Sequence, residues 1–295
     1  MNGATVAALQ AAASVGAGLS PSRAADEGGA APRLFNWFAA ERGVDVAVGV
    51  PYGPEPRHKL DVYRPRNGAE RPMVAVFFYG GSWQEGSRRL YPFIGTALAA
   101  RGVTTIIPDY RLYPEVCFPE FMVDAALAYA WVEANIAKTV TAVRPVALLG
   151  HSAGAHIAAL LALDPSYLDR HAGQASRPRA FIGLAGPYSF DPTAWPTTKA
   201  VFAPVAGDPD AARPVAFARA NAPAALLLHG LADRIVAPAN AHDMADALLR
   251  TGNAVHRIDY PGVGHMGLAL SLARPFRWRA PVLTDILNFL EAQGV

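Results

Sequence analysis

The sequence predicts an α/β protein in which a mostly parallel sheet is covered by helices on both faces. Two observations favour this class. Short apolar segments of strand length alternate with longer segments of helical periodicity. Several of the short segments are apolar throughout, as expected for strands buried on both faces. The length of 295 residues, with 52% hydrophobic and 17% charged side chains, suits one large domain.

The expected elements alternate along most of the chain. Early strands at 44–50 and 60–63 flank a turn that contains Pro and Gly. Later strands are expected at 73–78, 103–107, 145–149, 180–185, 224–228 and 254–260. Helices are expected at 91–100, 120–137, 155–161, 240–250 and 281–292. The Pro- and aromatic-rich segment 186–223 is expected to be a small cap-like insertion over the carboxyl edge of the sheet, with a plain surface loop as the alternative.

The most informative segment is G-H-S-A-G at residues 150–154, between an apolar strand and a helix-like run. A serine on such a turn has a strained backbone, and Gly150 and Gly154 avoid side-chain clashes around it. Ser152 is therefore a candidate nucleophile, although a chance match in a Gly- and Ala-rich chain is the alternative. A nucleophile of this kind requires an acid and then a histidine, each after a later strand.

Both partners occur in that order. Asp233 follows the strand at 224–228, and His265 follows the strand at 254–260. The histidine would accept the serine proton and later protonate the leaving group, while the acid would orient the imidazole. Three other histidines adjoin these segments but are more simply packing or loop residues: His151, His156 and His229.

The loop Y-G-G-S-W at residues 79–83 is a candidate oxyanion hole. Adjacent glycines let the backbone direct N–H groups at a substrate oxygen, so Gly80, Gly81 and Ala153 are the expected donors. An ordinary Gly-Gly turn is the alternative. Residues that could line an apolar pocket, or equally pack in the core, are Trp83, Tyr113, Phe118, Tyr188, Trp195 and Met266.

Composition excludes several other classes of function. The net charge is only +2 and the basic residues are dispersed, which gives no support for nucleic-acid binding. The one adjacent basic pair, Arg88 and Arg89, is expected in a solvated loop. A single cysteine allows neither an intrachain disulfide nor a thiolate zinc cluster, and no histidine motif indicates a metal site. We therefore expect no cofactor and no metal.

Residues 1–33 are expected to form a flexible extension, with a single domain at 34–295. The apolar stretch at 4–19, followed by small residues, resembles a secretory signal, but no Lys or Arg precedes it. It is too short and too weakly apolar to span a bilayer. We expect a cytoplasmic protein, with export as the alternative.

Taken together, the motifs resemble those of the α/β-hydrolase superfamily over residues 45–294. Within it, the chain is most similar to the esterase/lipase branch, which includes hormone-sensitive-lipase-like and BD-FAE-type carboxylesterases. The resemblance is carried by L-D-V-Y at 60–63, Y-G-G-S-W at 79–83, D-Y-R-L at 109–112, G-H-S-A-G-A-H at 150–156, H-G-x-x-D at 229–233 and G-H at 264–265.

The resemblance implies an α/β-hydrolase fold and a serine esterase that cleaves small or short-chain acyl esters through an acyl-enzyme. It implies Ser152, Asp233 and His265 as the catalytic triad, with the oxyanion donors given above. The chain departs from the family at Tyr79, where a histidine that supports the loop is usual. Kynurenine formamidases share neighbouring patterns, so amide-type hydrolysis is one alternative. A non-catalytic hydrolase-fold binding protein is another, and the sequence leaves the oligomeric state open.

Overall fold

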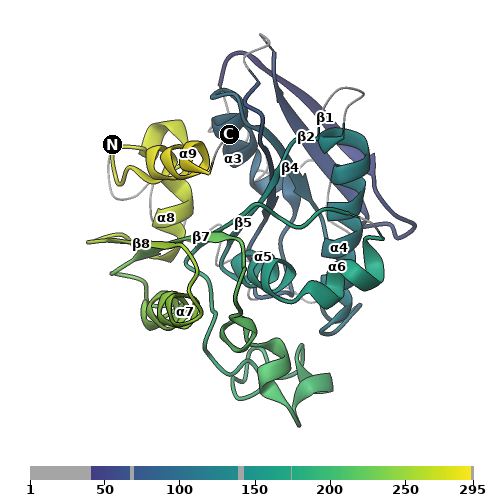
Figure 1. Ribbon diagram of the computed structural model, residues 1–295, viewed down its shortest axis with the longest axis vertical. Coiled ribbons are helices and arrows are strands. Elements are labelled where there is room, and N and C mark those ends of the chain that lie inside the picture. The colour runs from purple at the N-terminus through teal and green to yellow at the C-terminus, as the bar shows by residue number, and fades with distance from the viewer. Residues whose placement is uncertain (1–40, 67–69, 139–142, 174, 294–295) are drawn as a thin grey trace.

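The computed structural model describes residues 41–66, 70–138, 143–173 and 175–293, and in them one twisted sheet organises the fold (Figure 1). Its order is β1-β2-β4-β3-β5-β6-β7-β8. The strands are β1 (Val44–Pro51), β2 (Lys59–Pro65), β3 (Val74–Phe78), β4 (Thr104–Pro108), β5 (Val146–His151), β6 (Ala180–Leu184), β7 (Ala224–Gly230) and β8 (Val255–Tyr260). The expected extension at 1–33, with its signal-like stretch, lies outside the described residues.

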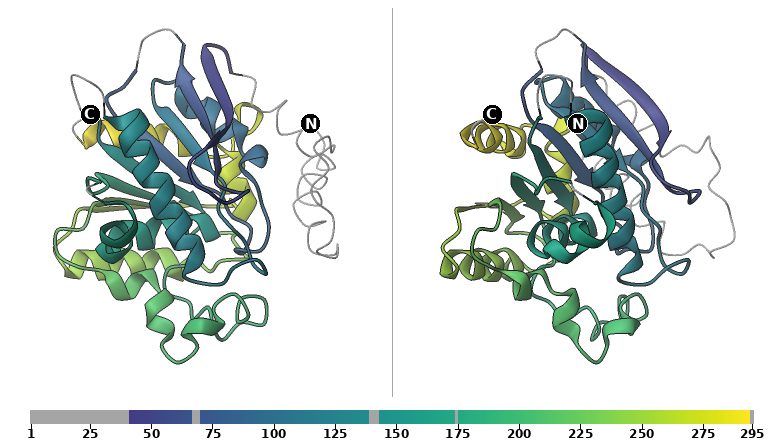
Figure 2. Two further views of the ribbon diagram at one scale, coloured as in Figure 1. Left: turned by 90° about the vertical axis from the view of Figure 1, so that its right-hand side faces the viewer. Right: turned by 45° about the vertical axis from the view of Figure 1, so that its right-hand side comes forward.

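Helices cover both faces of this sheet (Figures 1 and 2). The helices on one face are α3 (Pro92–Ala99), α8 (His265–Leu270) and α9 (Val282–Ala292). Those on the other are α4 (Glu120–Val132), α5 (Ala153–Leu163), α6 (Pro165–His171) and α7 (Ala239–Arg250). The short helical turns are η2 (Arg88–Leu90), η3 (Glu133–Ala137), η4 (Ala203–Val205), η5 (Pro209–Ala212), η6 (Pro214–Phe217) and η7 (Arg274–Phe276). In the described ranges, no helix has the length and apolar character to cross a bilayer.

The direction of the strands confirms the expected fold class. Strand β2 runs antiparallel to both β1 and β4, and every other neighbouring pair is parallel. Strands β3, β4, β5 and β6 are buried at every position, because helices cover them on both sides. Each fully buried Val, Leu, Ile or Phe side chain contributes about 1.5–3 kcal/mol to stability, so these strands form the centre of the core.

Two helices lie in segments for which the sequence predicted no element, and one basic residue differs from its expected environment. Asp164 caps helix α6 by accepting a hydrogen bond from the N–H of Ser166 at 2.9 Å. Helix α8 begins at His265, which follows β8 as the sequence predicts. Arg88 is buried rather than solvated, because its guanidinium forms ion pairs with Asp61 and Asp109.

The segment 185–223, drawn in green in Figure 1, leaves the carboxyl end of β6 and returns to the start of β7. It contacts loops that follow other strands of the sheet. The Gln84 side chain, after β3, donates to the carbonyl of Thr197 at 2.8 Å. The N–H of Phe118, after β4, donates to the carbonyl of Val201 at 2.9 Å. The segment therefore packs on loops at the carboxyl edge.

The chain passes from β5 to α5 through a tight turn at Ser152, which has φ 55° and ψ −123°. Glycines on both sides allow backbone contacts that no side chain would permit. A Cβ on Gly150 would lie 2.2 Å from the carbonyl oxygen of Gly154. A Cβ on Gly154 would lie 2.0 Å from the carbonyl oxygen of Phe78 on β3. The start of α5 is thus held directly against two strands.

We expect Gly154→Ala to destabilise the protein by at least about 3 kcal/mol, the upper end of the usual cost of overpacking, because backbone atoms on both sides must move. Urea unfolding would measure the change. Gly207→Ala is the matched control, since a Cβ there meets no atom within 4 Å. It should change stability by less than about 1 kcal/mol. Equal stability of the two variants would contradict the packing described here.

A buried histidine on α5 links the fold to pH. Nε2 of His156 donates to the carbonyl of Ala212, in the segment 185–223, at 2.7 Å. Burial lowers the pKa of His156 to about 4, whereas an unfolded histidine titrates near 6.5. Between these values the unfolded state binds a proton that the folded state does not. Stability contributed by the neutral imidazole is therefore complete above about pH 6.5 and decreases as the pH falls toward 4.

His156→Gln should flatten the pH dependence of unfolding between pH 6.5 and 4.5. The expected change in slope is up to about 1.4 kcal/mol per pH unit, the contribution of one proton. Urea unfolding at several pH values would measure it, with His256→Gln on the exposed part of β8 as the control. If the His156 and control variants keep the same slope as the wild type, His156 does not carry this effect.

Candidate active site

Ser152 lies at the carboxyl end of β5, at the N-terminus of α5. Its positive φ is unusual for a residue with a side chain and indicates local strain. The turn is held by the N–H of Ser152, which donates to the carbonyl of Leu184 at the end of β6 at 2.9 Å. The side chain is partly exposed. A strained, accessible hydroxyl beside the positive end of a helix has the features of a nucleophile.

Asp233, in the loop after β7, and His265, the first residue of α8, are brought together. Nδ1 of His265 lies 2.7 Å from Oδ2 of Asp233, and both side chains are buried. The loops after β7 and β8 are joined, because the N–H of Ala232 donates to the carbonyl of Val263 at 3.0 Å. Gly230 makes this contact possible, since a Cβ there would lie 2.2 Å from the same carbonyl oxygen.

The surroundings of Asp233 keep its carboxylate ionised. Burial alone would raise its pKa, but hydrogen bonds from His229 and His265 outweigh this effect and hold the pKa below its ordinary value. The other carboxylate oxygen accepts N–H bonds from Ile235 at 2.8 Å and Val236 at 3.0 Å. An ionised carboxylate only accepts hydrogen bonds. Nδ1 of His265 must therefore carry a proton, which leaves Nε2 free to act as a base.

Two histidines assigned to packing from the sequence contact this pair. Nε2 of His229 lies 3.0 Å from the Val236 carbonyl and 3.3 Å from Oδ2 of Asp233, so it donates toward both. Nε2 of His151 donates to the carbonyl of His265 at 3.2 Å. Burial, and then the nearby His265, lower the pKa of His151 to about 3, so it is neutral near pH 7. Both histidines therefore hold the pair in position through hydrogen bonds.

The structure does not join Ser152 to His265 by a hydrogen bond within the described residues. The two are linked through the residue before the serine, because the rings of His151 and His265 lie 4.8 Å apart, centre to centre. Hydrogen bonds between a nucleophile and its base are often long in a free enzyme and shorten when substrate binds. The arrangement is therefore compatible with a serine, histidine and aspartate acting in sequence.

The segment 79–86, which we call the oxyanion loop, follows β3 and touches the serine. A Cβ on Gly80 would lie 2.9 Å from Cβ of Ser152. Three consecutive residues of this loop have positive φ values: Gly81 at 137°, Ser82 at 52° and Trp83 at 60°. Successive residues in turn conformations can direct their N–H groups into one concave site that favours an anion.

The expected donors differ in what surrounds their N–H groups. Burial raises the pKa of Tyr91 to about 12, while a smaller effect of the Gly80 backbone lowers it. A hydrogen-bond donor lowers the pKa of a tyrosine because it stabilises the ionised hydroxyl. The N–H of Gly80 is therefore the group that faces the Tyr91 hydroxyl. Within the described residues, no acceptor is bonded to the N–H of Gly81, Ser82 or Ala153. Ser82 was not identified from the sequence, where only its place after two glycines could have indicated it.

The residues expected to line a pocket lie in different environments. Trp83, Phe118 and Tyr188 are buried, Tyr113 and Met266 are half-buried, and Trp195 is 58% exposed. Tyr188 packs as a core residue, since a Cβ on Gly183 would lie 1.8 Å from its hydroxyl. Trp195 is thus the one of these six candidates whose side chain is largely in contact with solvent.

Trp83 belongs instead to an aromatic cluster beneath the segment 185–223. The cluster consists of Trp83, Phe118, Phe121, His156 and Phe202. The ring of Trp83 meets those of Phe202 and His156 edge-on, at centroid distances of 4.8 and 4.9 Å. The ring centroid of Phe202 lies 5.4 Å from that of Phe118. All five side chains are at most 3% exposed, so the cluster fills the space beside the oxyanion loop.

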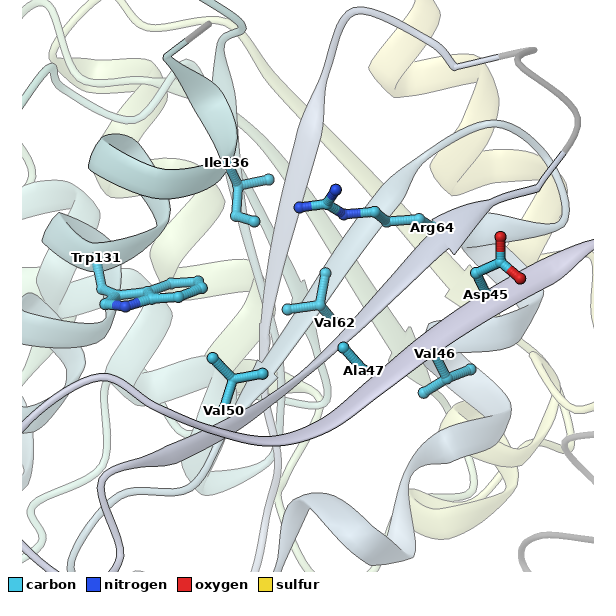
Figure 3. Close-up of a pocket in the computed structure, with 8 residues that line it drawn as sticks. All are labelled: Asp45, Val46, Ala47, Val50, Val62, Arg64, Trp131 and Ile136. Atoms are coloured by element: carbon cyan, nitrogen blue, oxygen red, sulfur yellow. The ribbon is translucent and has the colours of Figure 1, made fainter.

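A separate cavity of about 410 Å³ lies toward the β1 edge of the sheet, between the first two strands and the end of α4 (Figure 3). Its lining is Asp45, Val46, Ala47, Val50, Val62, Arg64, Trp131 and Ile136. It contains none of the predicted site residues, and β4 and β3 stand between β2 and the serine-bearing β5. The cavity is therefore distinct from the candidate active site.

Comparisons with known proteins agree with this architecture. Esterase LipC of Mycobacterium tuberculosis is 29% identical over 72% of this chain and 58% of LipC. Isoprenylcysteine alpha-carbonyl methylesterase ICME of Arabidopsis thaliana is 30% identical over 52% of this chain and 36% of that protein. The chain thus spans less than two thirds of either relative. An esterase structure from Thermogutta terrifontis, with propionate bound, is 25% identical with a TM-score of 0.69, covering 86% of this chain and 95% of that one.

The BD-FAE family matches residues 60–248, which is more than half of the chain. The match includes Ser152 and Asp233 and ends before His265. It agrees with the sheet order and with the esterase fold of the structural neighbours. The resemblance inferred from the motifs is therefore confirmed, and the chain belongs to the BD-FAE family of α/β-hydrolases, in the esterase/lipase branch.

Proposed function

We propose that this protein is a carboxylic-ester hydrolase that cleaves small or short-chain acyl esters through an acyl-enzyme on Ser152. One observation carries the proposal: the ionised Asp233 is paired with Nδ1 of His265, and this pair lies near the strained serine. The names of the relatives support the same reaction class, because LipC and the Arabidopsis protein are called esterases. The proposed substrate is a small molecule, and the proposal requires no metal or cofactor.

In the first half of the proposed reaction, Oγ of Ser152 attacks the ester carbonyl carbon and its proton moves to Nε2 of His265. Asp233 stabilises the resulting imidazolium, because it accepts the hydrogen bond from Nδ1. The tetrahedral intermediate then expels the alcohol, which takes the proton from Nε2. The products of this half are the free alcohol and an acyl group esterified to Ser152.

In the second half, water gives a proton to Nε2 of His265 and its oxygen attacks the acyl carbon. Collapse of the second intermediate breaks the bond to Oγ, which regains its proton, and releases the carboxylic acid. Both intermediates place negative charge on the former carbonyl oxygen. We propose Gly81, Ser82 and Ala153 as its N–H donors, since their N–H groups have no acceptor in the described residues. Gly80 serves the close approach to Ser152.

The aromatic cluster is the reason that we propose a short acyl group. Trp83 directly follows the proposed donors, and its ring is backed by Phe202 and His156. Because the side chains of the cluster are packed together and buried, they leave little space beside the oxyanion loop for a long acyl chain. The segment 185–223 supplies Phe202, which makes this segment a small cap that limits the acyl group. The Thermogutta terrifontis esterase structure has propionate bound, which has the short chain length proposed here.

We expect Ser152→Ala to lower turnover of p-nitrophenyl acetate by at least about 10³-fold, because loss of a triad nucleophile usually costs more than this. The fold should stay intact, as judged by urea unfolding. A fluorophosphonate should label the wild type at Ser152 with one-to-one stoichiometry. A folded Ser152→Ala protein with most of its activity would end this proposal, and an unlabelled, inactive wild type would favour a non-catalytic binding protein.

Amide-type hydrolysis is tested by assaying N-formylkynurenine in parallel with the ester. Faster turnover of N-formylkynurenine than of p-nitrophenyl acetate would favour this alternative.

Phe202→Leu should shift the preference toward longer acyl chains, because it opens the cluster without leaving a large void. The measurement is kcat/KM for p-nitrophenyl esters from acetate to octanoate. For the longer esters we expect kcat/KM to rise about 3–4-fold, which corresponds to the burial of one additional methylene group. Phe181→Leu, a buried phenylalanine on β6, is the matched control. The same chain-length profile in both variants would contradict the role given to Phe202.

A further inference from the structure

The oxyanion loop is tied at both ends by one arginine. Arg57, from the turn between β1 and β2, donates from Nη2 to the hydroxyl of Tyr79 at 2.9 Å and to the carbonyl of Gly86 at 3.0 Å. Its Nε donates to the carbonyl of Tyr110 at 2.9 Å. Tyr79 and Gly86 are the first and last residues of the loop. One planar guanidinium thus fixes the distance between the two ends.

The hydroxyl of Tyr79 connects this arginine to a buried carboxylate. It donates to Oδ1 of Asp109 at 2.9 Å, while accepting the hydrogen bond from Arg57. Asp109 also accepts from the backbone N–H of Arg88 at 2.7 Å and is ion-paired with the Arg88 guanidinium. Arg88 in turn pairs with Asp61 at 2.7 Å. In this series of contacts, each donor is therefore bonded to an acceptor and each carboxylate is paired with an arginine or a hydrogen-bond donor.

Packing leaves the Tyr79 ring no other position. It is stacked between the rings of Tyr110 and Tyr91, at centroid distances of 4.8 and 5.8 Å. The hydroxyl of Tyr110 donates to the Tyr79 carbonyl at 2.8 Å, which fixes the backbone immediately before Gly80. A Cβ on Gly86 would lie 2.9 Å from the edge of the Tyr79 ring. A side chain that is held on every side transmits its position to the backbone of the loop.

We propose that Arg57 and Tyr79 are positioning residues for ester hydrolysis, which clamp the two ends of the oxyanion loop and so pre-align its N–H donors. The inference rests on the proposed function at Ser152. Preorganised donors stabilise charge without reorganising during the reaction, so a loosened loop would stabilise the tetrahedral intermediates less. Neither residue is proposed to touch the substrate.

The tyrosine has a property that a histidine at this position would lack. Burial, and then the charge of Asp109, raise the pKa of Tyr79 well above its ordinary value. The groups that face its hydroxyl are Asp109 and Arg57, with the Tyr110 and Tyr91 rings on either side. The phenol therefore keeps its proton at every pH at which an esterase would work, whereas histidine titrates near 6.5. The clamp supports the loop without changing its charge.

The test compares Tyr79→Phe and Arg57→Lys with Tyr129→Phe. Tyr129, on α4 and away from the loop, is a matched control. It is also a buried tyrosine, and its hydroxyl donates to the carbonyl of Ser176. For each variant we would measure kcat and KM for p-nitrophenyl propionate, inhibition by an aryl trifluoromethyl ketone, and urea unfolding. The ketone forms a tetrahedral adduct with an active serine and so reports on the oxyanion site directly.

Tyr79→Phe and Arg57→Lys should each lower kcat by about 10-fold or more, less than the ~10²–10³-fold loss typical of removing a donor outright. KM should change by less than about 2-fold, because both tetrahedral intermediates are affected equally. Binding of the ketone should weaken by the same factor as kcat. The double variant should lose much less than the product of the single effects, since both remove one clamp. Tyr129→Phe should lose stability but keep the wild-type kcat.

Two results would overturn the inference. One is a Tyr79→Phe protein with wild-type kcat and ketone affinity. The other is a Tyr129→Phe protein whose kcat falls as much as that of Tyr79→Phe, which would reduce the effect to general stability. Ser152→Ala, assayed alongside, separates the two proposals. If Ser152→Ala is inactive while Tyr79→Phe is fully active, only the clamp is wrong; if Ser152→Ala is active, the proposed function itself is wrong.

Discussion

The close approach of three backbone segments at the carboxyl edge of the sheet is the constraint on which the rest of the site depends. Helix α5 can start beside β3 only because Gly154 has no side chain to meet the Phe78 carbonyl. The same closeness at Gly150 forces the turn that gives Ser152 its positive φ. Gly80 then brings the oxyanion loop against the serine. The proposed nucleophile and its proposed donors are adjacent because no side chain separates their backbones.

Around this centre, buried polar groups are arranged so that each charge is satisfied. Asp233 stays ionised because two histidines and two backbone N–H groups donate to it. The neutral His151 braces the backbone of His265 without competing for the proton. On the other side of the serine, Arg57 and Asp109 hold Tyr79 in the same manner. Both networks fix geometry at the cost of burying polar atoms, and in the first of them Nδ1 of His151 and Nδ1 of His229 have no hydrogen-bond partner among the described residues.

Local signals predicted much of this molecule, and the residues that they missed depend on long-range contacts. The central strands and the order of Ser152, Asp233 and His265 follow from apolar runs and from the chemistry that a nucleophile requires. The antiparallel direction of β2 has no such signal, because strand periodicity does not encode direction. Composition could not separate the exposed Trp195 from the buried Phe202. Arg57 contacts Tyr79 and Tyr110, which lie 22 and 53 positions further along the chain, so nothing near it in the sequence indicates its role.

The central claim is that Ser152 carries the acyl group during turnover. The most direct measurement is mass spectrometry of the enzyme mixed with p-nitrophenyl propionate and quenched in acid within milliseconds, followed by peptide mapping. We expect a propionyl group on the peptide that contains Ser152, at a level that decays at the rate of turnover, and no such group in Ser152→Ala. A propionyl group on a different residue, or Ser152→Ala hydrolysing the ester at the wild-type rate, would contradict this claim.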